Sequence, residues 1–169
     1  MNHNMDTSLN LEAKALASML SELGLSLSCA ESCTGGMAAA TITDGAGASR
    51  FFYGGIVAYS NTIKERILGV SADILLHHGA VSEETALDMA RGAARLFGSD
   101  CAFAITGIAG PDGATADKPL GTVWFAYTVA GTSLAEHMRF SGERSDVRHA
   151  ATAHALRRMS MLASLYGRR

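Results

Sequence analysis

The chain has 169 residues, of which 48% are hydrophobic and only two are prolines. Length and composition predict one ordinary globular domain, residues 1–169, with a substantial core. The formal net charge is −2 and both signs are spread along the chain, which excludes the basic surface that nucleic-acid binding needs. We therefore expect a small-molecule ligand.

No export or membrane signal is evident. Residues 1–6 are polar, we expect the first few to be disordered, and no run approaches the roughly 18 apolar residues of a membrane span. We expect a cytoplasmic protein that does not bind a membrane. The three cysteines are an odd number, which favours free thiols, and neither they nor the six histidines show the paired spacing of a zinc site.

The first half of the chain predicts a helix, a strand and a second helix. Apolar residues recur every three or four positions over residues 9–23, and Gly24 can end that helix. Residues 25–30 alternate as a strand does, and an alanine-rich helix follows from Met37. Between them lies the small-residue turn 31–36, Glu-Ser-Cys-Thr-Gly-Gly. Such a turn presents N–H groups and a positive helix end, which suits an anion.

The rest of the chain alternates strands with helices. Further strands are predicted at residues 54–59, 101–106, 122–129 and 134–140, and helices at 62–68, 82–97 and 145–166. Residues 44–49 read as a loop, and residues 70–78 are ambiguous. This order predicts an α/β fold, a three-layer α/β/α sandwich whose mixed, partly parallel sheet ends in an antiparallel hairpin.

Polar residues follow the first three predicted strands. Ser32 follows the first, Tyr59 ends the second, and Thr106 and Gly107 close the third. Ligands of such sheets bind beyond the carboxyl ends of the strands, so we expect these residues to converge on one edge.

A serine and a lysine could work together at this edge. Lys64 lies early in its predicted helix, against the positive dipole end, and partial burial would lower its pKa until the neutral amine could act as a general base. A Ser-Lys pair is a known variant of the catalytic triad, and Tyr59 could relay the proton. The N–H groups of Thr34, Gly35 and Gly36 could stabilise an oxyanion.

Each of these residues also has a structural interpretation. Ser32 could be a turn or N-cap hydroxyl, Lys64 a solvated surface lysine, and Tyr59 an aromatic residue packed on the sheet. Cys33 is a rival nucleophile, because a helix N-terminus would lower its pKa.

Two arginines near the start of the last helix also have two interpretations. Arg144 and Arg148 could bind a phosphate or could form a solvated face of the helix.

Five motifs in order carry a resemblance to a known family. They are Ala-Glu-Ser-Cys-Thr-Gly-Gly at 30–36, Tyr-Ser-Asn at 59–61 with Lys64, His-Gly-Ala-Val-Ser at 78–82, Gly-Ile-Ala-Gly-Pro-Asp-Gly at 107–113 and Lys-Pro-Leu-Gly-Thr-Val at 118–123. On these motifs the chain resembles the CinA C-terminal domain family of competence/damage-inducible proteins, including its stand-alone form, the nicotinamide-nucleotide amidases. The resemblance runs from about the first helix to the last.

The resemblance implies a function and a set of site residues. It implies hydrolysis of nicotinamide mononucleotide to nicotinate mononucleotide and ammonia in pyridine-nucleotide salvage, without metal or cofactor. Ser32 would be the nucleophile, Lys64 its base and Tyr59 an assisting residue. Ser49 and Thr106 would line the same site, and Arg144 would lie on the phosphate side of the substrate.

The resemblance also implies a homodimer or higher homo-oligomer. The two-domain CinA proteins carry an additional N-terminal domain, whose activity is not attributed to this chain. An alternative function is a regulatory module that binds a nucleotide without turning it over.

Overall fold

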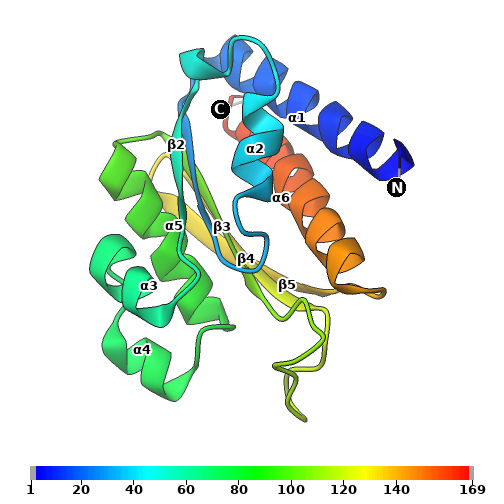
Figure 1. Ribbon diagram of the computed structural model, residues 1–169. Coiled ribbons are helices and arrows are strands. Elements are labelled where there is room, and N and C mark those ends of the chain that lie inside the picture. The colour runs from blue at the N-terminus through cyan, green and yellow to red at the C-terminus, as the bar shows by residue number, and fades with distance from the viewer. Residues whose placement is uncertain (1–2, 168–169) are drawn as a thin grey trace.

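The structure is a computed structural model that describes residues 3–167, and five strands form its central sheet (Figure 1). The strands are β1 Leu27–Glu31, β2 Phe52–Val57, β3 Cys101–Gly107, β4 Thr122–Val129 and β5 Thr132–Arg139. Their order in the sheet is β2-β1-β3-β4-β5. β1 pairs in parallel with both β2 and β3, whereas β4 pairs antiparallel with β3 and β5. The prediction of a mixed, partly parallel sheet ending in a hairpin is confirmed.

Helices cover both faces of the sheet, which confirms the three-layer α/β/α architecture. One layer contains α1 His3–Leu23, α2 Met37–Thr43 and α6 Arg144–Tyr166. The other contains α3 Asn61–Leu68, α4 Ala72–His77 and α5 Glu83–Phe97. In Figure 1 the chain between β3 and β4 extends beyond the lower end of the sheet.

The two faces of the sheet differ in side-chain size. Along β3, Phe103 and Ile105 pack toward α1 and α6, whereas Ala102 and Ala104 pack toward α5. All four side chains are fully buried, because a strand with helices on both faces meets no solvent. Small residues on the α5 side allow that helix to approach the sheet closely.

Several element bounds differ from the sequence predictions. The first strand is Leu27–Glu31 instead of 25–30, because the Leu25 N–H still donates to the Leu20 carbonyl at the end of α1. The second strand is Phe52–Val57 instead of 54–59, because the sheet register places Phe52 beside Leu27 and the ladder ends at Val57. Tyr59 therefore lies beyond the strand.

Three segments are more helical than expected. The ambiguous segment 70–78 contains the helix α4, and the predicted loop 44–49 leads into a 3-10 turn, η1 Ala48–Arg50. Helix α1 begins at His3, inside the segment expected to be disordered, and residues 1–2 of that segment lie outside the described part of the chain. Within residues 3–167, no helix combines the length and apolarity that crossing a membrane would need.

Candidate active site

Ser32 and Lys64 meet at the edge where the parallel strands β1, β2 and β3 end. Ser32 is the first residue after β1, and its N–H donates to the Ile105 carbonyl of β3 at 2.8 Å. The Lys64 Nζ lies 3.0 Å from the Ser32 Oγ. The structure thus brings the two predicted catalytic residues into direct contact.

The Lys64 side chain is almost completely buried. Its side chain is 1% exposed, its Nζ donates to the Ala58 carbonyl at 2.7 Å, and it forms no ion pair with any of residues 3–167. Burial lowers the pKa of the Lys64 amine, because the charged form loses its hydration. The neutral amine is the form that can accept a proton from Ser32.

The start of α3 places Lys64. Ser60 caps the helix, and its side chain accepts a hydrogen bond from the Ile63 N–H at 3.3 Å. The cap sets where the first turn begins, so Lys64 falls on the helix face that packs toward the sheet.

Glu31 organises the turn that carries the nucleophile. Its carboxylate is 1% exposed and accepts hydrogen bonds from the N–H groups of Gly36 at 3.1 Å, Ala38 at 3.1 Å and Ala39 at 2.8 Å. These bonds satisfy the first turn of α2 and place a negative charge at its positive end. Sequence reasoning missed this role, since a cap normally lies next to its helix.

Two of the three expected oxyanion donors are engaged within the turn itself. The Gly35 N–H donates to the Ser32 carbonyl at 3.1 Å, and the Gly36 N–H donates to Glu31. Thr34 is fully buried, and none of these three residues lines the cavity beside Ser32. The prediction that Thr34, Gly35 and Gly36 face the substrate is therefore wrong, because the Glu31 carboxylate occupies the positive end of the helix dipole.

The pKa of the Cys33 thiol is raised, whereas its position near a helix N-terminus predicted a lowered pKa. Burial raises the pKa of its thiol to about 11, and the Glu31 carboxylate also raises it. The helix N-terminus that would have favoured a thiolate is already neutralised by Glu31. Cys33 is thus a poor rival to Ser32 as the nucleophile.

A cavity of about 270 Å³ opens beside the Ser32–Lys64 pair. Six predicted site residues line it, namely Ser32, Lys64, Tyr59, Thr106, Gly107 and Arg144. Sequence reasoning did not assign a site role to others that line it, including Asn61, Ala80 and Asp112. Asn61 and Asp112 lie in the motifs at 59–61 and 107–113 that the chain shares with the family. Membership of these motifs was the sequence signal that could have identified both residues.

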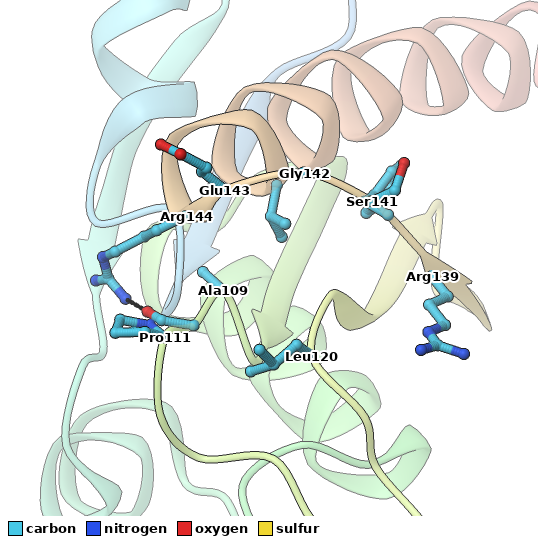
Figure 2. Close-up of a pocket in the computed structure, with 11 residues that line it drawn as sticks. Ala109, Pro111, Leu120, Arg139, Ser141, Gly142, Glu143 and Arg144 are labelled. Carbon is cyan, nitrogen blue, oxygen red and sulfur yellow. Dashed lines mark hydrogen bonds between the residues drawn. The ribbon is translucent and has the colours of Figure 1, made fainter.

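Tyr59 is held by Arg144 rather than by Lys64. The Tyr59 side chain is 61% exposed, and its hydroxyl accepts a hydrogen bond from the Arg144 Nη2 at 3.0 Å. The Arg144 Nη1 donates to the Gly110 carbonyl at 2.7 Å, a bond drawn in Figure 2. Arg144 thereby ties the segment after β2 to the loop after β3.

The third strand contributes a rigid wall of the cavity. The buried Thr106 hydroxyl donates to the Ala80 carbonyl at 2.6 Å. A side chain at Gly107 would lie 2.8 Å from the Thr122 carbonyl, so only glycine fits there. The loop after β3 is held by the Lys118 Nζ, which donates to the His78 carbonyl at 2.6 Å.

Two predicted residues lie elsewhere. Ser49 belongs to η1, which precedes β2, whereas the site lies at the other end of that strand, so the prediction that Ser49 lines the same site is not met within one chain. Arg148 donates from its Nη2 to the Thr34 carbonyl at 2.8 Å. Arg148 therefore supports the nucleophile turn, which neither interpretation of it predicted.

The described chain shows free thiols and no clustered metal ligands. Cys29, Cys33 and Cys101 are buried and unpaired with one another. Across residues 3–167, no three His, Cys, Asp or Glu side chains gather as a metal site would require.

The fold and the site together define a class of protein. It has an α/β/α fold with a buried serine-lysine pair at the edge of the mixed sheet where the parallel strands have their carboxyl ends. The chain belongs to the CinA C-terminal domain family, whose pattern matches residues 10–163. The resemblance drawn from the motifs is thereby confirmed.

Solved structures and curated relatives agree with this assignment. A competence damage-inducible protein A from Klebsiella pneumoniae has a TM-score of 0.90 at 36% identity, over 92% of this chain and 97% of that one. Nicotinamide-nucleotide amidohydrolase PncC of Escherichia coli K12 is 45% identical over 89% of this chain and 92% of its own length. A putative competence-damage inducible protein of Desulforudis audaxviator is 50% identical over 85% of this chain, which spans only 35% of that protein.

Proposed function

We propose that this chain is an amidohydrolase that converts nicotinamide mononucleotide to nicotinate mononucleotide and ammonia, with Ser32 as nucleophile and Lys64 as general base. The observation that carries the proposal is the 3.0 Å contact between the Lys64 Nζ and the Ser32 Oγ. The substrate is supported by the Escherichia coli relative, which is named a nicotinamide-nucleotide amidohydrolase.

The first half of the reaction forms an acyl-enzyme. The neutral Lys64 amine takes the proton of the Ser32 hydroxyl, and the Oγ attacks the carbonyl carbon of the carboxamide. The tetrahedral intermediate collapses as its C–N bond breaks, and the Lys64 ammonium returns the proton to the departing nitrogen, which leaves as ammonia. Until then this ammonium lies beside the developing oxyanion and stabilises its charge.

The second half releases the acid. Lys64, neutral again, takes a proton from a water molecule that attacks the ester carbonyl. The bond to the Ser32 Oγ breaks, the proton passes to that oxygen, and nicotinate mononucleotide leaves. The Ala58 carbonyl, which accepts from the Lys64 Nζ at 2.7 Å, holds the amine in place throughout the cycle.

The test is release of ammonia by purified variants. We expect Ser32→Ala and Lys64→Ala each to lower kcat by at least about 1,000-fold, because nucleophile and base act as one unit. Ser18→Ala and Lys14→Ala, on the exposed face of α1, are the matched controls and should keep wild-type rates. Full activity in either site variant would contradict the mechanism, and a wild-type protein that binds the nucleotide without releasing ammonia would indicate a regulatory module instead.

A further inference from the structure

A second, larger cavity lies next to the proposed catalytic cavity. It has a volume of about 690 Å³ and shares three lining residues, Ala109, Gly110 and Arg144, with the cavity beside Ser32. The hydrogen bond from Arg144 to the Gly110 carbonyl lies in the shared wall (Figure 2). The two cavities are therefore neighbouring compartments of one surface region.

The cavity beside Ser32 is small for a site that binds a whole nucleotide. Its volume of about 270 Å³ lies below the range of roughly 300–1,000 Å³ in which ligand pockets usually fall. If the carboxamide of the substrate is at Ser32, as the proposed function requires, the sugar and phosphate must extend out of that cavity. The neighbouring cavity has the volume to receive them.

An arginine at the end of β5 lines the larger cavity. Arg139 is exposed, and within residues 3–167 its guanidinium makes no hydrogen bond or ion pair. Arg144 adds a second positive charge at the shared wall. The nearby Glu143 carboxylate accepts the backbone N–H of Asp146 in the capping box of α6, and Figure 2 shows it on the opposite side of the cavity from Arg139.

The position of Arg139 is set by the sheet. Arg139 is the last residue of β5 and lies opposite Thr122 of β4. The next residue, Phe140, donates its N–H to the Gly121 carbonyl at 2.9 Å, and a side chain at Gly121 would collide with the Phe140 carbonyl. Arg139 is therefore held at the paired end of a strand and does not belong to a loop.

The distance along the sheet edge suits an extended ligand. β1, β3, β4 and β5 are successive strands, so three strand spacings, about 14 Å in all, separate the end of β1 from the end of β5. Both ends lie at the same edge of the sheet, because β4 runs antiparallel to its two neighbours. A ligand bound at Ser32 that extends along this edge approaches Arg139 with its far end.

From this arrangement we propose that the larger cavity is the subsite for the phosphate-bearing end of the substrate and that Arg139 selects a nucleotide over the corresponding nucleoside. The proposal rests on the proposed function for the identity of the substrate. It goes beyond it by assigning the subsite and a specificity-determining residue.

The test compares a nucleotide with its nucleoside in charge-removing and charge-keeping variants. We expect Arg139→Gln to raise the KM for nicotinamide mononucleotide about tenfold with kcat unchanged, as loss of one charged hydrogen bond implies. The kcat/KM for nicotinamide riboside should stay at its wild-type value. Arg139→Lys should remain close to wild type, and Arg91→Gln, an exposed change on α5, is the matched control.

Calorimetry separates this proposal from the proposed function. Nicotinate mononucleotide should bind wild type more tightly than nicotinate riboside, and Arg139→Gln should remove that difference even if the protein releases no ammonia. A wild-type enzyme that turns over the nucleotide while Arg139→Gln leaves both KM and binding unchanged would overturn the subsite and leave the proposed function standing. Equal losses for nucleotide and nucleoside would also overturn it, because they would indicate a merely structural role.

Discussion

Lys64 has two properties of a general base that works at neutral pH: it is buried, and it contacts the hydroxyl of Ser32. The amine is 1% exposed, and it lies 3.0 Å from the hydroxyl that it would deprotonate. Burial lowers its pKa by penalising the charged form, so a larger fraction of the amine is neutral than in a solvated lysine. The same burial that costs stability thus prepares the residue for proton transfer.

The pH dependence of activity follows from this state of Lys64. We expect kcat/KM to rise as pH increases through the lowered pKa of the Lys64 amine and then to level off, because only the neutral amine accepts a proton. Lys64→Arg should be inactive at every pH, since a guanidinium stays protonated. Initial rates of ammonia release across this pH range measure the effect, and a flat profile with an active arginine variant would exclude the base role.

Stability should change with pH in the same direction. Between the lowered pKa in the folded state and the ordinary lysine value, the unfolded chain binds a proton at Lys64 that the folded chain does not. The free energy of unfolding contributed by Lys64 therefore rises with pH across that window. Urea denaturation should show wild type gaining stability relative to Lys64→Met as the pH rises toward the ordinary lysine pKa of about 10.4. A constant difference between the two proteins would mean that the pKa is not lowered.

The Cys33→Ala variant tests whether Ser32 or Cys33 is the nucleophile. Because burial raises the pKa of its thiol to about 11, almost none of it is thiolate at neutral pH. We expect Cys33→Ala to change kcat for ammonia release less than about threefold, whereas a loss comparable to that of Ser32→Ala would make Cys33 the nucleophile.

At the scale of elements, Glu31 couples strand β1 to helix α2. Its carboxylate, at the end of the strand, accepts hydrogen bonds from three backbone N–H groups at the start of the helix. The turn that contains Ser32 is held between the strand and the helix. The three bonds fix the angle at which the helix leaves the sheet, and so the direction of the Ser32 hydroxyl.

Replacing that carboxylate should loosen the turn. We expect Glu31→Gln to lower the free energy of unfolding by about 1–3 kcal/mol, because the amide cannot accept all three bonds with the strength of a carboxylate. The kcat should fall while the KM changes little, since the effect is on Ser32. Urea denaturation and initial rates measure the two effects. Glu22→Gln, on the exposed face of α1, is the control, and wild-type kcat in Glu31→Gln would rule out a positioning role.

The geometry of the site depends on how closely helix α3 packs against helix α5. Gly92 of α5 faces the backbone of Leu68 in α3, and a side chain at Gly92 would collide with it. α3 carries Lys64, while Ser32 directly follows strand β1. The distance between base and nucleophile therefore depends on packing between α3 and α5, and Gly92 is far from both residues in sequence.

Gly92→Ala tests this dependence. The added methyl group should displace α3, lowering the free energy of unfolding by about 1–3 kcal/mol and reducing kcat as Lys64 moves away from Ser32. Gly45→Ala is the matched control. A methyl group at Gly45 would make only ordinary van der Waals contact, and the backbone of Gly45 does not adopt the positive φ that strains other residues. A Gly92→Ala protein with wild-type kcat would show that the Ser32–Lys64 distance does not depend on this packing.

Much of the fold was predictable because its signals are local. The capping serines before α3 and α5, the alternation along the strands and the glycines after α1, α3 and α5 each act within a few residues. The convergence of Ser32, Tyr59 and Thr106 on one edge followed from the parallel arrangement of their strands. Element bounds were less predictable, because pairing register decided where β2 begins and ends.

Periodicity and motif order are properties of the chain alone, and they were sufficient to predict the α/β/α architecture, the family, and Ser32 and Lys64 as a candidate pair. The contacts of these groups are visible only in the folded protein: Glu31 occupies the helix end expected to hold an oxyanion, Tyr59 binds Arg144, and Ser49 lies at the other end of β2. Such contacts escape sequence reasoning because burial and hydrogen-bond partners depend on residues distant in sequence. The pKa of Lys64 falls because of the layers packed around it, which no local pattern specifies.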